Sequence, residues 1–176
     1  MLFKILITVA CLFNVANAEG AYVQLSSTVT QPNGAIGVGS ALTYNSIDAG
    51  PVNITFTSGS SVITVVKAGA YFIIAAPQVG YSGSGVGFFG SLFGRTASFT
   101  ADYYVVVNGT PVANSNVRLS AASDHKDVIV TQGVYVLAAG DKIEIFGAGT
   151  DSFSEFITQA GEPDIPSIIT TVFSVN

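Results

Sequence analysis

The sequence has 176 residues, but only one of them is a cysteine, Cys11, and only one is a histidine, His125. Cys11 lies in an N-terminal segment that we expect to be removed, so the mature protein would have no thiol. This excludes disulfide bonds, cysteine–zinc sites and a cysteine nucleophile. Stability must then come from packing, with help from oligomerisation.

Charge is also scarce. Charged residues make up 10% of the chain, against roughly a quarter in ordinary soluble domains. Six basic residues face eleven acidic ones, and because phosphate binding needs clustered Lys and Arg, the composition argues against a nucleic-acid partner. A surface with so few ions, in a chain rich in aromatic and β-branched residues, favours burial in subunit contacts.

The first eighteen residues have the form of a signal peptide. Lys4 precedes an apolar run at 5–15, and Ala16-Asn17-Ala18 has the small-x-small pattern that signal peptidase requires. We therefore expect a signal peptide at 1–18, a single domain at 19–176 and secretion without a membrane anchor. The alternative is lipid attachment at Cys11, although a lipid-attachment cysteine normally follows a longer apolar region.

Beyond residue 18 there is almost no helical periodicity, and period-two alternation recurs every ten or so residues with Gly, Asn, Ser or Pro between the runs. The pattern predicts an all-β antiparallel sandwich. The expected strands lie at 22–30, 53–57, 61–66, 70–76, 99–107, 127–138, 142–146 and 168–175, those at 99–107 and 127–138 being the longest, with a bulge at Gly133 in the latter.

Alternation also predicts which side chains enter the core. The apolar segment 70–76 is typical of a central strand that is covered on both sides. The strands expected at 22–30 and 53–57 should each bury one face. Glu144 should point to solvent. The residues expected to point inward near the C-terminus are Ile143, Ile145, Ile169, Phe173 and Val175.

Three short segments predict turns between strands: Lys67-Ala68-Gly69, Asn108-Gly109 and Ala139-Gly140-Asp141. Each contains a glycine, which can adopt backbone angles closed to other residues. We expect Asp141 to accept a hydrogen bond within its turn.

The order of these segments resembles the globular head domain of the C1q family, within the C1q and tumour-necrosis-factor-like group, from about Ala41 to Val175. The matching features are Tyr71 two residues after Gly69, the Val107-Asn108-Gly109 hairpin, the step at 137–143 and the closing Val172-Phe173-Ser174. Two features depart from the family pattern: the last strand stops without the usual Gly-Phe continuation, and the segment 77–98 is longer than the family's loop.

The resemblance implies a jelly roll of about ten strands that assembles as a homotrimer and binds an extracellular protein or glycan without performing chemistry. As in some members of the family, Asp124 and Asp127 could bind a calcium ion near the trimer axis; no other cofactor is expected. Candidate interface aromatics are Tyr103, Tyr104, Tyr135 and Phe146, for which core packing is an equal alternative.

The segment 85–94 combines glycines with Phe88, Phe89, Leu92 and Phe93 in an expected loop. Large apolar side chains in a loop could contact a partner or a membrane. Alternatively, they fold over an open end of the sandwich or a neighbouring subunit, which we favour.

Other motifs have ordinary explanations. His125 lies in Ser123-Asp124-His125-Lys126-Asp127, which we interpret as a polar loop because no nucleophile motif surrounds any serine. Asn53-Ile54-Thr55 and Asn108-Gly109-Thr110 fit the N-glycosylation pattern, which has meaning only in a eukaryotic secretory pathway.

The sequence thus predicts a secreted, non-enzymatic recognition or adhesion module that acts as a homotrimer. Two alternatives remain open: a building block of an extracellular layer or appendage, and a membrane-active protein that uses the Gly/Phe segment. An enzyme is the least favoured interpretation.

Overall fold

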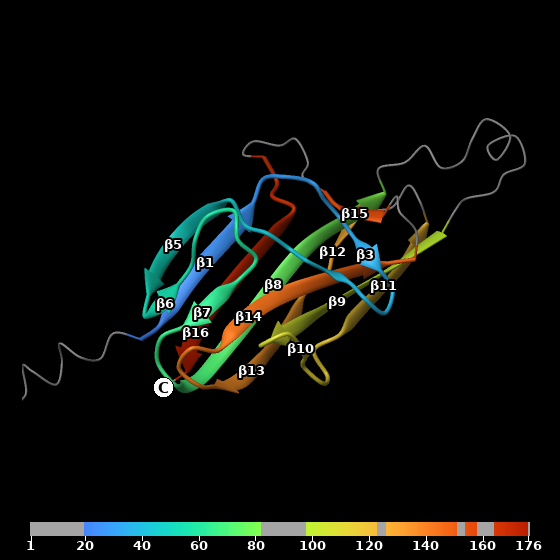
Figure 1. Cartoon of the computed structure of the whole chain (residues 1–176). Coiled ribbons are helices and arrows are strands. Elements are labelled where there is room, and N and C mark those ends of the chain that lie inside the picture. The colour runs from blue at the N-terminus through green and yellow to red at the C-terminus, as the bar shows by residue number, and fades with distance from the viewer. Residues whose placement is uncertain (1–19, 82–97, 123–125, 151–153, 158–163, 176) are drawn as a thin grey trace, which may run out of the picture.

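The computed structural model describes residues 20–81, 98–122, 126–150, 154–157 and 164–175 (Figure 1). These residues form sixteen strands, of which six have only two residues, and the remaining ten match the expected strand number. No helix that could cross a membrane is found among them.

The strands form two sheets, and apart from the parallel pair β3–β14 their neighbours run antiparallel. The first sheet contains β5 (Ser46–Val52), β1 (Tyr22–Ser27), β16 (Ile168–Val175), β8 (Gly69–Tyr81), β13 (Thr131–Leu137), β12 (Asp127–Val128), β15 (Ser154–Phe156) and β2 (Gln31–Pro32). The second sheet contains β6 (Ile54–Thr55), β7 (Ile63–Val65), β14 (Lys142–Gly149), β9 (Ser98–Val107), β10 (Thr110–Pro111), β11 (Val117–Ala122), β3 (Gly34–Ala35) and β4 (Ser40–Ala41).

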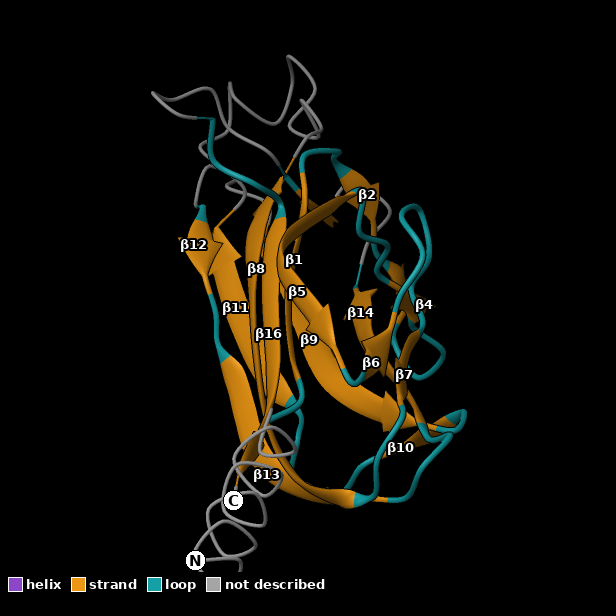
Figure 2. Ribbon diagram, turned by 90° about the vertical axis from the view of Figure 1, so that its left-hand side faces the viewer, coloured by secondary structure: helices purple, strands orange, loops and turns teal. Residues whose placement is uncertain are grey.

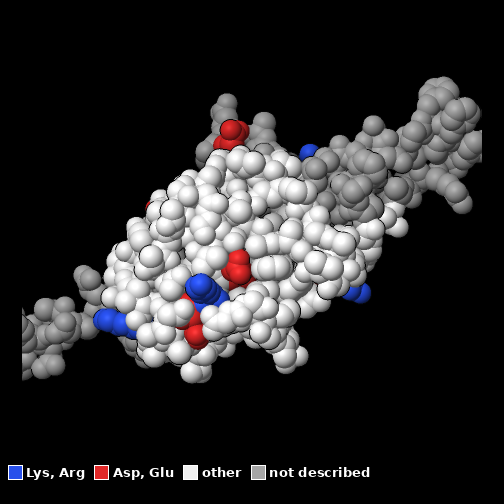
Figure 3. Space-filling view, viewed as in Figure 1, with Lys and Arg blue, Asp and Glu red and all other residues white. Residues whose placement is uncertain are grey.

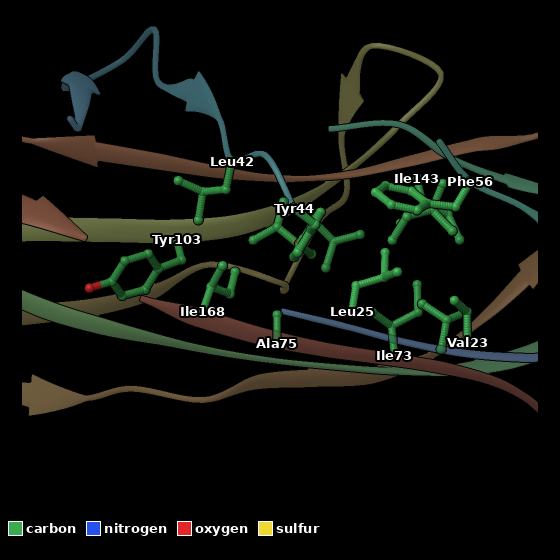
Figure 4. Packing of buried hydrophobic residues seen from close by; sticks show 14 of the residues in the cluster. Val23, Leu25, Leu42, Tyr44, Phe56, Ile73, Ala75, Tyr103, Ile143 and Ile168 are labelled. Carbon is green, nitrogen blue, oxygen red and sulfur yellow. The ribbon is translucent and has the colours of Figure 1, made fainter. Parts of the chain in front are cut away.

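Figure 2 shows the sandwich from its side, with β13, β8 and β16 in one layer and β14, β7 and β6 in the other. The core lies between the layers, where side chains of both sheets interdigitate (Figure 4). Its largest fully buried members are aromatic and branched residues: Tyr44, Tyr71, Tyr103, Phe99, Phe156, Leu25, Leu42, Ile63, Ile73, Ile143, Ile145 and Ile168.

Most of the expected inward positions are confirmed. Val23 and Leu25 are buried in β1, and Ile54 and Phe56 are buried at β6 and just after it. In β14 the isoleucines at 143 and 145 are completely buried, whereas Glu144 points outward and accepts a hydrogen bond from Ser61 Oγ at 2.7 Å. Alternation therefore places the buried face correctly where the opposite face is polar.

The expected face of the last strand is wrong. Ile169, Phe173 and Val175 are 38%, 39% and 44% exposed, whereas Ile168 and Val172 are completely buried. Since successive side chains of a strand point to opposite faces, an error of one position inverts the whole assignment. Both faces of β16 carry large apolar residues, so the sequence does not show which face points to solvent.

Three details of the strands also differ from expectation. The strands β7 and β8, on either side of the Lys67-Ala68-Gly69 segment, belong to different sheets, and so do β13 and β14 on either side of Ala139-Gly140-Asp141. Of the three expected turns, only Asn108-Gly109 therefore closes a hairpin, and the other two connect the sheets. Gly69 is the first residue of β8 and has no positive φ, unlike Gly109 and Gly140. The segment 127–138 is divided into β12 and β13 with regular pairing at Gly133, and β8, with thirteen residues, is the longest strand.

The hairpin turn at Asn108-Gly109 and the turn between β13 and β14 are joined to one another. Asn108 Nδ2 donates to Asp141 Oδ1 at 2.8 Å, and the backbone N–H of Lys142 donates to Asn108 Oδ1 at 2.9 Å. The second carboxylate oxygen of Asp141 accepts from the backbone N–H of Ala138 at 2.7 Å. This confirms the expected turn role of Asp141.

The beginning of β1 and the end of β16 lie side by side. Tyr22 is opposite Phe173 in the β1–β16 ladder. Two further bonds join the flanking residues, from Ala21 N to Ser174 Oγ at 2.9 Å and from Ser174 N to Ala21 O at 2.8 Å. The first and last strands are thereby fixed to each other at one end of the sandwich.

Candidate interaction surface

The outer face of the first sheet carries a continuous row of large apolar side chains. The strand register places Val134 of β13 opposite Phe72 of β8, Phe72 opposite Phe173 of β16, and Phe173 opposite Tyr22 of β1. The rings of Phe72 and Phe173 pack with centroids 5.4 Å apart and planes tilted by 50°. Neighbouring strands thus build one surface from residues far apart in the chain.

We call the outward side chains of β13, β8 and β16 the apolar face; they are Gln132, Val134, Val136, Ala70, Phe72, Ile74, Ala76, Ile169, Thr171, Phe173 and Val175. None of these residues is charged. Val136 is 89% exposed and Val134 is 59% exposed, both at the edge strand β13.

Such a face has a limited chemistry. Among its members only Gln132 and Thr171 have polar side-chain atoms, so it offers little for orienting or activating a substrate. An exposed apolar surface of this kind marks a site of contact with another protein, a membrane or a ligand. The two packed phenylalanines, Phe72 and Phe173, are the type of residue that dominates the energy of such contacts.

The four candidate interface aromatics separate into two groups. Tyr103 is completely buried in the core, and Tyr135 is partly buried and packs against the core. For both residues the alternative of core packing therefore holds. Tyr104 and Phe146 lie opposite each other on the outer face of the second sheet, with ring centroids 5.9 Å apart. None of the four belongs to the apolar face.

The remaining expected site residues fall mostly outside the described residues. This is so for Phe88, Phe89, Leu92 and Phe93 of the Gly/Phe segment, and for Asp124 and His125. Asp127 is described: it is exposed in β12, and its Oδ1 accepts a hydrogen bond from the backbone N–H of Val128 at 2.8 Å.

No group of three or more His, Cys, Asp or Glu side chains suited to a metal is found within the described ranges. The calcium site at Asp124 and Asp127 stays a prediction. Of the two glycosylation motifs, Asn108 is exposed at a hairpin and uses its side-chain amide in the turn contact, and Asn53 is half-buried between β5 and β6.

Sequence reasoning missed the apolar face because it placed Phe173 and Val175 in the core. One signal could have revealed it: the adjacent pairs Ile168-Ile169 and Val172-Phe173 give β16 apolar residues on both faces, as expected of a strand that is covered twice.

The charge of the surface agrees with the composition. In the view of Figure 3 most of the surface is uncharged, and several of the few charged side chains gather in one small group of both signs. This view shows the side of the molecule on which β14 and β7 lie in front of β8 and β16.

Comparison with known proteins identifies the architecture. No protein-family model and no curated protein matches the sequence. Among solved structures, the globular domain of a zebrafish complement 1qA protein superposes with a TM-score of 0.52 and 14% identity, over 89% of this chain and 98% of that chain. The two facing sheets and this superposition show that the chain has a C1q-like jelly-roll fold.

Proposed function

We propose that this protein is a secreted, non-enzymatic recognition or adhesion module that works as a homotrimer and binds an extracellular protein or glycan. The observation that carries the proposal is the apolar face. It is uncharged, it includes two phenylalanines whose rings pack against each other, and its edge residue Val136 is 89% exposed in the single chain.

A second copy of the chain is the partner that fits this face best. The face offers apolar area and almost no hydrogen-bonding groups, as do the centres of homo-oligomer interfaces. Covering it removes apolar surface from water without burying an unpaired charge. It also accounts for a secreted chain in which charged residues are only 10% of the total.

Assembly would also serve recognition. Three copies present three equivalent binding surfaces, and linking several weak contacts raises the overall affinity without any new contact. The C1q-like fold is the second support for the proposal, since the matched structure is a domain of a complement protein. Secretion is supported by the signal-peptide pattern at 1–18.

The test is the mass of the mature protein, from Glu19 onward, by light scattering at micromolar concentration with and without a chelator. We expect a trimer. The double variant Val134→Lys/Val136→Lys should be monomeric, because each lysine would carry a charge into the buried interface. The control is Val38→Lys, since Val38 is 73% exposed outside the apolar face.

A monomeric wild type, or a double variant that still forms trimers, would show that the apolar face does not join the copies. Larger assemblies that grow with concentration would favour a building block of an extracellular layer. Dissociation by the chelator would indicate that calcium supports the trimer, as the resemblance implies for Asp124 and Asp127.

A further inference from the structure

The outer face of the second sheet contains a hollow of about 270 Å³ that is open to solvent. It lies over β9 and β14, and the chain around β10 and β11 forms one of its sides; Figure 1 shows these strands together. Its lining includes Asp102, Tyr104, Ala148, Pro111, Val112 and Asn116. The apolar face belongs to the other sheet and shares no residue with this hollow.

The floor of the hollow holds a carboxylate that is almost fully buried although it points away from the core. Asp102 is 6% exposed. Strand register places it between Arg118 of β11 and Ala148 of β14. Because alanine has only a methyl group, the hollow can form beside the carboxylate instead of being filled by a neighbouring side chain.

Arg118 fixes this carboxylate in a bidentate pair. Its Nε donates to Asp102 Oδ1 at 2.6 Å and its Nη2 donates to Oδ2 at 2.7 Å. The pair is electrically neutral, and it uses two of the five N–H donors of the guanidinium. The arginine side chain is 60% exposed, so the remaining donors lie at the surface beside the hollow.

One wall is aromatic. The ring of Tyr104 packs beside Phe146, and its hydroxyl donates to the backbone oxygen of Val38 at 3.3 Å. Burial and the nearby charge of Asp102 raise the pKa of Tyr104, so that the hydroxyl stays protonated at neutral pH. Pro111 and Val112 add apolar surface, and the exposed amide of Asn116 adds a donor and an acceptor at the rim.

These groups suit a ligand with hydroxyls on one side and C–H groups on another. Carboxylate, guanidinium and amide are planar groups that bond neighbouring hydroxyls in pairs, and aromatic and proline surfaces cover C–H groups. The neutral Asp102–Arg118 pair gives no preference for a charged ligand. The volume lies just below the range of roughly 300 to 1,000 Å³ that is typical of small-molecule sites.

We propose that this hollow binds one unit of a neutral saccharide. The inference deepens the recognition role proposed above by naming its ligand class, and it does not require the trimer. Asn116 and Asp102 bond the sugar hydroxyls, Tyr104 and Pro111 cover its C–H face, and Ala148 leaves the room that the ring needs.

The test is an NMR titration of the mature protein with glucose, galactose, mannose and N-acetylglucosamine, with glucuronate as the anionic probe. We expect at least one neutral sugar to shift the amide signals of β9, β10 and β14. Asn116→Ala, which changes an exposed side chain, should weaken its binding about 5- to 10-fold through the loss of one hydrogen bond.

A second variant and a control complete the experiment. Ala148→Leu fills the hollow and should weaken binding more than about 10-fold while every hydrogen-bonding group stays. Ser120→Ala, an exposed position on β11 outside the hollow, should bind as the wild type does.

The inference is overturned if none of the four sugars binds, if only glucuronate binds, or if binding survives both Asn116→Ala and Ala148→Leu. Light scattering of the same samples separates this result from the proposed assembly. A trimer that binds no sugar refutes only the saccharide site, and a monomer that binds sugar refutes only the trimer.

Discussion

Asn108 and Asp141, thirty-three positions apart, hold the β9–β10 hairpin and the turn between β13 and β14 together through a hydrogen bond of 2.8 Å from the amide to the carboxylate. Asn108 has a φ of 51°, in the left-handed region that asparagine tolerates better than most residues. The side chain therefore serves its own turn and the neighbouring one, and it couples the end of β9 to the beginning of β14.

Two substitutions at Asn108 should lower the unfolding temperature by different amounts. Asn108→Gly keeps the left-handed backbone and removes the amide, so the unfolding temperature should fall by a few degrees. Asn108→Asp places a second carboxylate against Asp141 and should cost more at neutral pH than the glycine variant does. Thermal unfolding followed by circular dichroism measures both, and equal losses would mean that the amide–carboxylate contact is not the coupling.

Asp141 should make the free energy of unfolding depend on pH in the acidic range. Its pKa is lowered by the hydrogen bond from Asn108 and by the backbone N–H of Ala138. A carboxyl with a lowered folded pKa stabilises the protein above its unfolded pKa of about 3.9, and this contribution disappears as the pH falls through the folded pKa. Urea midpoints of wild type and Asp141→Asn should therefore converge in acid, and a difference that stays constant down to pH of about 2 would contradict this origin.

Ile168 and Ile169 form a matched test of the register of β16. Ile168 is completely buried and Ile169 is 38% exposed. In the monomeric Val134→Lys/Val136→Lys background, Ile168→Ala should reduce the free energy of unfolding by about 2 to 5 kcal/mol. Ile169→Ala should cost less than about 1 kcal/mol. The opposite order in urea unfolding would place the other face of the strand inward.

Two buried tyrosines should respond differently to loss of the hydroxyl. Tyr44 Oη lies 2.8 Å from Thr170 Oγ1, so Tyr44→Phe leaves a buried threonine hydroxyl unpaired and should cost about 1 to 2 kcal/mol. The Tyr103 hydroxyl is buried without a hydrogen-bond partner among the described residues. Tyr103→Phe should therefore be neutral or stabilising. A loss as large as that of Tyr44→Phe would show that the Tyr103 hydroxyl is paired.

The sandwich could be predicted because most strands signal their faces. In β1 the polar Gln24 lies between Val23 and Leu25, and this alternation gives both the strand and its buried side. In β16 the neighbours Val172 and Phe173 are both large and apolar, so the strand could be predicted but its inner face could not. The outer face of a strand can be predicted from the sequence only when polar residues occupy that face.

The candidate sites depend on contacts that the order of residues does not contain. Arg118 meets Asp102 only because β11 pairs with β9 in one register, and Ala148 meets Asp102 only because β14 pairs on its other side. Val136 is exposed because β13 lies at the edge of its sheet. A single sequence predicts strands more readily than the pairing between strands. These surfaces depend on that pairing.

The pairing of Tyr22 with Phe173 and the bonds between Ala21 and Ser174 bring the first and last described strands to one pole of the domain. A short peptide linker could join the N-terminal end of β1 to the C-terminal end of β16, and new termini could be opened at the exposed Asn108-Gly109 tip. The resulting circular permutant would keep every ladder of the two sheets. Cargo fused at either end of the chain would leave from the same pole, so reporter proteins or surface tethers can be attached without covering the opposite pole.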